Sequence, residues 1–192
     1  MIKIGKDTSK FSICSCQPES FKELKRIIKV RIDEEGPGCD LNDIDVSLVT
    51  DMSYLFYNTG FAGNVSRWNV SNITDMSYMF AWTEFNGDIS KWNTSKVKDM
   101  ACMFTHSKFN GNISNWNVSN VKKMMGMFYE SDFNSDISKW NVSNVKNMSV
   151  MFYKSRFNQD ISNWKIGTSV NLNKMFFCCP IKEEYKPKSL QK

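Results

Sequence analysis

The sequence predicts an α/β repeat fold, in which units of one strand and one short helix stack side by side and pair their strands in a parallel sheet. Tryptophan recurs every 24 residues, five times from Trp68 to Trp164. Phenylalanine keeps the same interval in a column that begins at Phe56 and reaches Phe176. An amphipathic segment over residues 20–35 precedes the first copy and is suited to cover the open end of such a stack.

Other positions of the repeat are apolar in nearly every copy. Two columns hold most of the methionines: Leu55, Met79, Met103, Met127, Met151 and Met175, and then Met52, Met76, Met100, Met124, Met148 and Leu172. A second phenylalanine column and a column of branched residues share the interval: Phe61, Phe85, Phe109, Phe133 and Phe157, and then Leu41, Val65, Ile89, Ile113, Ile137 and Ile161. Side chains that recur at one interval are expected to lie over one another and to form one continuous core.

A single copy predicts its own local structure. Residues 113–121, ISNWNVSNV, have the apolar-x-x-apolar-x-apolar-x-x-apolar spacing of a leucine-rich repeat, with other residue types in the leucine positions. The alternation of Trp116, Asn117 and Val118 predicts a short strand. The apolar residues within 124–128 fall at i, i+3 and i+4, which predicts one or two helical turns. Each copy is therefore expected to be a strand, a corner, a short helix and a turn.

The two ends of the chain differ from the repeats. Ser20 and Glu23 form an S-x-x-E capping box ahead of an apolar stripe, and Gly36-Pro37-Gly38 ends the expected helix. A helix that is free, or that binds a partner, is the alternative to a cap. Residues 1–40 are therefore expected to form a tail and a capping helix, residues 41–177 about six repeats, and residues 178–192 a frayed, charged C-terminal tail.

The repeat also resembles a known family. The units SNWNVSNVKKMMGMFYESDFNSDI and SKWNVSNVKNMSVMFYKSRFNQDI are similar to the W-N-V-S-N-V-x-x-M-x-x-M-F...F-N-x-D-I repeat of BspA-like leucine-rich repeat surface proteins of bacteria, over roughly residues 41–177. The resemblance implies a right-handed solenoid, a place at the cell surface, a role in adhesion or protein contacts, and no catalytic residues. Two features depart from the family pattern: no export signal is visible, and the last copy degrades to WKIGTSVNLNKMF.

A strand that faces the core with alternate residues leaves the others outside, so the sequence predicts which side chains form the outer face of the sheet. These are the candidate partner-binding residues: Arg67, Asn69, Lys91, Asn93, Asn115, Asn117, Lys139, Asn141 and Lys165. This face is polar and mildly basic, and it fits a protein or a glycan partner. The alternative is structural, because stacked asparagine amides can bond along a stack.

Composition excludes several classes of function. The 25 basic and 20 acidic residues give a net charge of +5 and are mixed along the chain, which does not favour nucleic acid. No apolar run is long enough to insert into a membrane, and the first residues lack a secretory signal. The six cysteines, Cys14 and Cys16 among them, lack zinc-site spacing. We expect reduced thiols, with a terminal metal or disulfide as the alternative.

The sequence contains little that indicates catalysis or metal binding. Cys102 and His106 have the i, i+4 spacing of a nucleophile and base on one helical turn, but no third group orients them. The recurring Asp88, Asp136 and Asp160 are expected to serve turns rather than calcium, and the methionine columns are expected to pack. Trp82 lies outside the apolar columns and is expected near the convex surface. We therefore expect no cofactor, no metal and no enzymatic activity.

Two functions remain as hypotheses. The first is an adhesion or interaction module at a bacterial surface, and the second is a structural spacer or intracellular scaffold without a specific ligand. A cell-surface or secreted location follows from the resemblance, and a cytoplasmic one is the alternative. A monomer is expected.

Overall fold

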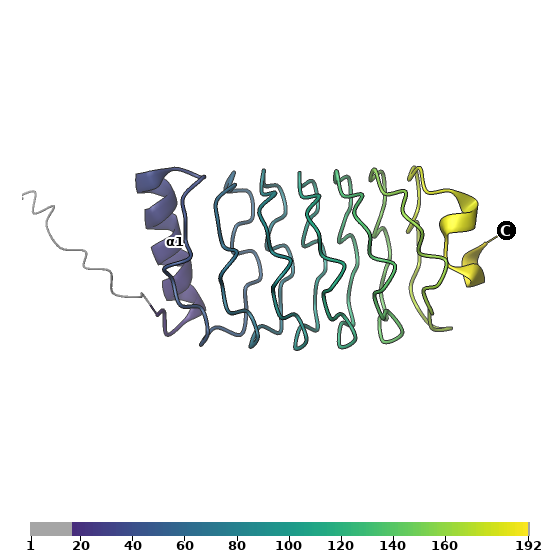
Figure 1. Ribbon diagram of the computed structural model, residues 1–192, viewed down its shortest axis with the longest axis horizontal. Coiled ribbons are helices and arrows are strands. Elements are labelled where there is room, and N and C mark those ends of the chain that lie inside the picture. Colours follow the sequence, from purple (N-terminus) through teal and green to yellow (C-terminus); the bar gives the residue numbers. More distant parts are fainter. Residues whose placement is uncertain (1–16, 192) are drawn as a thin grey trace, which may run out of the picture.

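The protein is an elongated stack of similar coils (Figure 1). The computed structural model describes residues 17–191, and Cys14 and Cys16 lie outside them. Helix α1 spans Phe21–Glu35 and lies against one end of the stack, while two short 3-10 helices, η1 over Glu183–Tyr185 and η2 over Lys188–Leu190, lie at the other end (Figure 1).

The capping helix is confirmed. Ser20 is the N-cap, and its hydroxyl accepts a hydrogen bond from the Glu23 amide at 3.2 Å. This contact satisfies one of the amides that a helix start leaves without a partner. Leu24 and Ile28 are buried against the stack, whereas Val30 on the opposite side of the helix is 43% exposed. The apolar stripe of α1 therefore covers the first coil.

Residues 24 positions apart do lie over one another, as expected. The rings of Trp92 and Trp116 stack with their centroids 6.4 Å apart and their planes within 4°. Phe80 and Phe104 stack at 5.8 Å in the neighbouring column. Because every coil repeats these contacts, the apolar columns merge into one core along the stack.

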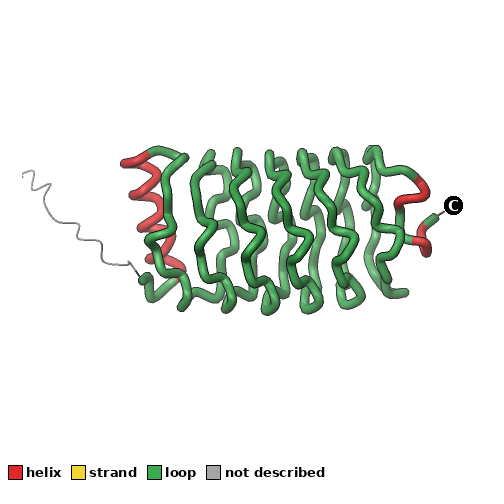
Figure 2. Tube along the Cα trace, viewed as in Figure 1, coloured by secondary structure: helices red, strands yellow, loops and turns green. Residues whose placement is uncertain are grey.

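The predicted parallel sheet of strand-plus-helix units is wrong. Within residues 17–191, α1, η1 and η2 are the only helices, and no strand forms (Figure 2). The β-type pairing between neighbouring coils is limited to isolated parallel bridges, such as the one between Asp75 and Asp99. Stacking is retained, but the leucine-rich-repeat solenoid is not supported.

Tight turns replace the predicted strand. The Trp116 amide donates to the Ile113 carbonyl at 3.1 Å, and the Val121 amide donates to the Val118 carbonyl at 3.0 Å. Each turn follows an Asp or Asn whose side chain accepts the amide two positions on, as Asn117 does from Ser119 at 3.1 Å. Such Asx turns compete with strand pairing. The apolar-x-x-apolar spacing therefore marks the two ends of a turn, both of which point to the core.

Turns also replace the predicted short helix. In residues 100–106, the amides of Cys102 and Phe104 donate to carbonyls of the next coil, Met125 at 2.8 Å and Met127 at 2.9 Å. The intervening Met103 amide bonds instead within its own coil, to Met100 at 3.3 Å. Cys102 and His106 have left-handed φ values of 55° and 51°, and the corresponding residues of the other coils do the same. A left-handed residue in each turn interrupts helical propagation.

The tryptophan column links neighbouring coils through its indole N–H groups. Each buried Trp donates from Nε1 to a main-chain carbonyl 27 residues earlier, as Trp116 does to Ile89 at 3.0 Å and Trp140 to Ile113 at 3.0 Å. A buried indole needs such an acceptor. This explains why a tryptophan, rather than another large apolar residue, recurs in the slot.

The C-terminal residues, which were expected to fray, instead fold onto the last coil. The Ile161 amide donates to the Tyr185 carbonyl at 2.9 Å, and the Lys188 amide donates to the Ser162 carbonyl at 3.2 Å. Ile181 is buried to 7% exposure. These contacts cover part of the last coil with η1 and η2.

Candidate functional site

The nine candidate partner-binding residues are all exposed, and they occupy the turns around the tryptophan column. We call this surface the turn face: Arg67, Asn69, Lys91, Asn93, Asn115, Asn117, Lys139, Asn141 and Lys165. Arg67 lies within the turn closed by the Trp68 amide and the Val65 carbonyl, at 3.2 Å. Because every coil repeats that turn, the structure brings these residues into regular rows, although not on a sheet.

The asparagines of the turn face do not bond to one another along the stack. The Oδ1 atoms of Asn69, Asn93, Asn117 and Asn141 each accept the amide of the serine two positions on, at 3.1–3.2 Å. None of their Nδ2 groups donates to another residue between positions 17 and 191. The oxygen of each amide therefore stabilises a turn, while the N–H2 group is available to a hydrogen-bond acceptor outside the protein.

Other asparagines, which the sequence analysis did not single out, connect the coils. Asn110 accepts the Asn134 amide at 2.7 Å, and Asn134 accepts the Asn158 amide at 2.8 Å. The Nδ2 group of Asn120 donates to the Ser95 carbonyl at 2.7 Å. Their 24-residue recurrence was the available signal, but recurrence alone does not distinguish a bond within a turn from a bond between coils.

Carboxylates lie beside the cations of the turn face. Hydrogen bonds from the hydroxyl and amide of Ser90 lower the pKa of Asp88, and nearby Lys91 adds to this effect. The pKa of Asp136 is lowered chiefly by the Ser138 amide, with a smaller effect from Lys139. These aspartates are ionised at neutral pH and cap turns, which confirms their predicted turn role. The face is therefore a mixture of both charges rather than simply basic.

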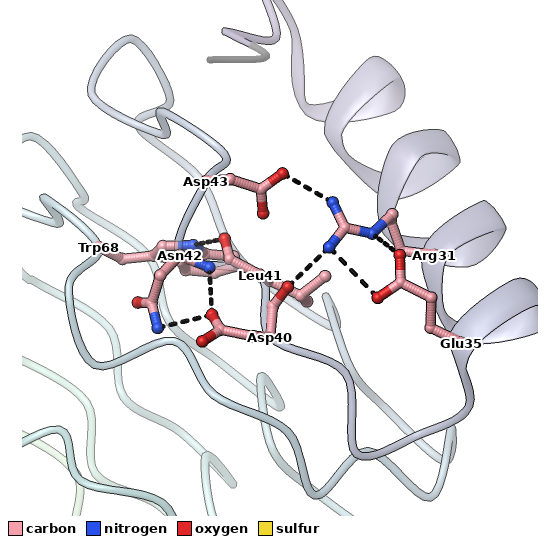
Figure 3. Close-up of polar contacts among 7 residues, drawn as sticks. All are labelled: Arg31, Glu35, Asp40, Leu41, Asn42, Asp43 and Trp68. Atoms are coloured by element: carbon pink, nitrogen blue, oxygen red, sulfur yellow. Dashed lines mark hydrogen bonds and ion pairs between the residues drawn. The ribbon is translucent and has the colours of Figure 1, made fainter. Parts of the chain in front are cut away.

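At its N-terminal end the turn face borders a hollow of about 400 Å³, lined by residues that include Asn42, Asp43, Asp45 and Arg67. Asn42 accepts the Arg67 amide at 2.7 Å. Arg31 of α1 approaches this region, bonds the Asp43 carboxylate and the Asp40 carbonyl, each at 2.8 Å, and pairs with Glu35 (Figure 3).

The carboxylates of Asp43 and Glu35 raise the pKa of Arg31, with the Asp43 hydrogen bond as the main cause. The guanidinium ties α1 to the first coil. The Trp68 indole donates to the Leu41 carbonyl at 2.8 Å beside this junction (Figure 3). The hollow is thus lined by polar and apolar side chains together, and the hydrogen bonds of Arg31 and Trp68 hold the main chain beside it in place.

Cys102 and His106 do not form a nucleophile-base pair in this geometry. The Cys102 thiol donates to the Met125 carbonyl at 3.5 Å. His106 stacks on Trp82 with ring centroids 3.8 Å apart, and its Nδ1 lies 3.7 Å from a Glu130 oxygen. Trp82 is 50% exposed, so its predicted place near the surface is confirmed.

Sequence reasoning missed two columns of surface aromatic rings away from the turn face. Tyr54 and Tyr78 stack at 4.5 Å, and Tyr129 and Tyr153 stack at 4.8 Å. The signal was present, because tyrosine or phenylalanine recurs at 129, 153 and 177. The columns are broken by small residues in the middle copies, which hid them among variable positions.

Two absences concern only the part of the chain that the structure describes. Between residues 17 and 191, no three His, Cys, Asp or Glu side chains converge as a metal site would require. The same stretch contains no helix with the length and apolar character needed to cross a membrane.

A comparison with known protein families shows which family the chain belongs to. Residues 33–131 and 83–185 both match a family described as Mycoplasma protein of unknown function, DUF285. The chain belongs to this family. The two matches overlap, and together they run through all the coils. No curated protein matches the chain, and no solved structure matches it. The likeness to BspA-like proteins stays a prediction.

Proposed function

We propose that this DUF285 protein is a non-enzymatic interaction module that docks a partner on the turn face. The observation that supports the proposal is the regular display of exposed Nδ2 donors next to Arg67, Lys91 and Lys139, at one step per coil. A partner with carboxylates or carbonyls at matching intervals would accept these hydrogen bonds, as an acidic protein or an acidic glycan can. The stacked core keeps the donors in place before binding, which lowers the entropy cost of association.

The proposed setting is a bacterial cell surface, where the module would serve adhesion. This setting rests on the likeness of the repeats to BspA-like surface proteins. Labelling intact cells with a membrane-impermeant amine reagent tests it, since a surface protein is labelled without lysis. Labelling only after lysis would refute the surface location.

One observation favours the second function, a spacer without a specific ligand. The Asn oxygens of the turn face already serve turns, and Asp88 and Asp136 lie beside the cations. A face whose charges are matched internally is solvated well without any partner.

A charge-reversal experiment separates the two functions. The triple variant Arg67→Glu, Lys91→Glu and Lys139→Glu reverses three cations of the turn face. The matched control reverses three exposed lysines of another column, Lys98→Glu, Lys122→Glu and Lys146→Glu. In a pull-down from bacterial and host surface proteins, the first variant is expected to lose the partners that the unchanged protein and the control retain. Equal capture by all three proteins would count against the turn face as the binding surface, and no specific capture by any of them would favour the spacer.

A further inference from the structure

The first coil ends in a row of main-chain carbonyls that the rest of the stack does not use. In the second coil, the carbonyls of Asp75, Ser77 and Met79 accept amides of the first coil at 2.9–3.0 Å. The equivalent carbonyls of the first coil, at residues 51, 53, 55 and 57, face the same way, away from the second coil and towards the end of the stack that holds α1. Within residues 17–191 none of them accepts a hydrogen bond. Alternate carbonyls in a row form the acceptor side of a pairing edge.

A groove lies next to this edge. It has a volume of about 610 Å³ between α1 and the first coil, and it is lined by Lys25, Arg26, Ile28, Lys29, Ile32, Asp33, Tyr54, Leu55, Tyr57 and Thr59. This volume is within the range of small-ligand sites and is sufficient for a few residues of a peptide. Tyr54 and Tyr57 are 44% and 42% exposed, so their rings offer apolar contact to an occupant.

The charge of the groove selects among occupants. Three cations of α1 line it, and the one acidic residue, Asp33, pairs with Lys29 at 2.7 Å. Among the described residues, neither Lys25 nor Arg26 has a carboxylate partner; Lys25 lies over the Phe21 ring instead, at 5.4 Å. The groove is therefore cationic on its helix side and accepts hydrogen bonds on its coil side.

We propose that this groove binds an acidic polypeptide segment, which pairs its alternate main-chain N–H groups with the open carbonyls of the first coil. Its carboxylates lie against Lys25 and Arg26, and its apolar side chains lie against Ile28, Ile32 and the tyrosines. Only a polypeptide supplies N–H donors at this spacing, and only an acidic one matches the helix side. This site is separate from the turn face, so it adds a second partner site to the molecule.

A second copy of the chain fits less well. The far end of the stack has free donors, because the amides of Leu172, Lys174, Phe176 and Cys178 make no hydrogen bond between residues 17 and 191. Donors on one copy could meet acceptors on another. However, Lys174 would bring a further cation towards Lys25 and Arg26. Helix α1 also lies at the same end of the stack, where the groove beside it admits one extended segment but not the whole face of another coil (Figure 1).

Fluorescence anisotropy with the full-length chain tests the proposal. The probe is a fluorescein-labelled eight-residue peptide of alternating glutamate and valine, and the comparison peptide replaces glutamate with lysine. The glutamate peptide is expected to bind, and the lysine peptide is not. Two further probes carry N-methyl groups on the odd or on the even residues. Binding should be lost for one of them only, because only one set of amides faces the edge.

Protein variants locate the site. Lys25→Glu with Arg26→Glu is expected to weaken binding by about tenfold, since two attractive charges become repulsive. The turn-face triple variant is the control and should bind as the unchanged protein does, which also keeps this test separate from the proposed function. No binding of the glutamate peptide, equal binding of the lysine peptide, or equal binding of both N-methylated probes would overturn the proposal. A mass that doubles with concentration in sedimentation, and falls in the Lys25→Glu, Arg26→Glu variant, would identify a second copy as the occupant and also overturn it.

Discussion

At the scale of single residues, small and polar side chains determine how closely one coil approaches the next. Gly63 is the clearest case. A Cβ placed there would lie 2.1 Å from the Cys39 carbonyl oxygen and 2.7 Å from the Phe61 ring. The main chain of the cap region therefore approaches the first coils so closely that a methyl group cannot fit. A Cβ placed on Gly38, only one residue from Cys39, would have no neighbouring atom within 4 Å.

This difference gives a prediction with a matched control. Gly63→Ala should lower the free energy of unfolding by about 1–3 kcal/mol, because backbone and ring must both move. Gly38→Ala should change it by about 0.5 kcal/mol or less. Urea denaturation of the two variants measures the difference. Equal stability of the two would show that the cap region is less tightly packed than described.

The acidic Asx caps give a prediction of pH dependence. The pKa values of Asp88, Asp136 and Asp160 lie below the ordinary value because serine amides and hydroxyls bond the ionised form. Because the folded-state pKa is lowered, this stabilisation is complete above the unfolded-state pKa of about 3.9. It is lost as the pH falls from there through the lower folded-state pKa. The urea midpoint is therefore expected to decrease from about pH 5 to about pH 2.

Asparagine in the same turns provides the control, because Asn112 already caps Ser114 at 3.0 Å without titrating. The triple variant Asp88→Asn, Asp136→Asn and Asp160→Asn should fold and should show a smaller loss of urea midpoint over that pH interval. The same pH slope in the variant would mean that these three caps do not cause the acid sensitivity.

At the scale of elements, the sequence predicted the capping helix well and the repeat unit poorly. Ser20, Glu23 and the apolar stripe of α1 are local signals, since a cap and a 3.6-residue period depend on neighbours in the chain. The strand and the short helix of each copy were wrong for a shared reason. Apolar residues three apart, such as Ile113 and Trp116, fit a repeat corner, a helical turn and a β-turn equally well.

The Asx caps distinguish a β-turn from a repeat corner or a helical turn. Asn and Asp in front of most apolar-x-x-apolar groups accept an amide two positions on, as Asn117 does. The same oxygens also account for part of the candidate site. All nine residues of the turn face were predicted to be exposed and are exposed. Their hydrogen bonds could not be predicted, because they depend on whether the backbone at Asn117 is extended or turned.

The capping element itself can be tested by substitution. Leu24 is fully buried between α1 and the first coil, whereas Val30 on the same helix is 43% exposed. Leu24→Ala should lower the free energy of unfolding by about 2–5 kcal/mol through lost burial and an unfilled cavity, and Val30→Ala by much less. Thermal denaturation followed by circular dichroism measures both. A helix that does not cap the stack would make the two substitutions equivalent.

At the scale of the whole molecule, stability is a property of contacts between neighbouring coils. Ring stacking, indole hydrogen bonds and amide-to-carbonyl bonds all run from one coil to the next. The stacking of neighbouring coils was predictable from the interval of 24 residues alone. If all coils have the same length and shape, residues 24 apart in sequence lie over one another in space. The absence of strands between residues 17 and 191 was not predictable from the interval, because alternate amides, such as that of Met103, bond within their own coil rather than to a neighbour.

The hydrogen-bond pattern of residues 100–106 is therefore the central claim, and scalar couplings across hydrogen bonds measure it directly by NMR. The account predicts couplings from the amide nitrogens of Cys102 and Phe104 to the carbonyl carbons of Met125 and Met127, and from the Met103 amide nitrogen to Met100 in the same coil. A coupling from the Met103 amide to a residue of a neighbouring coil would indicate a parallel sheet and would contradict the account.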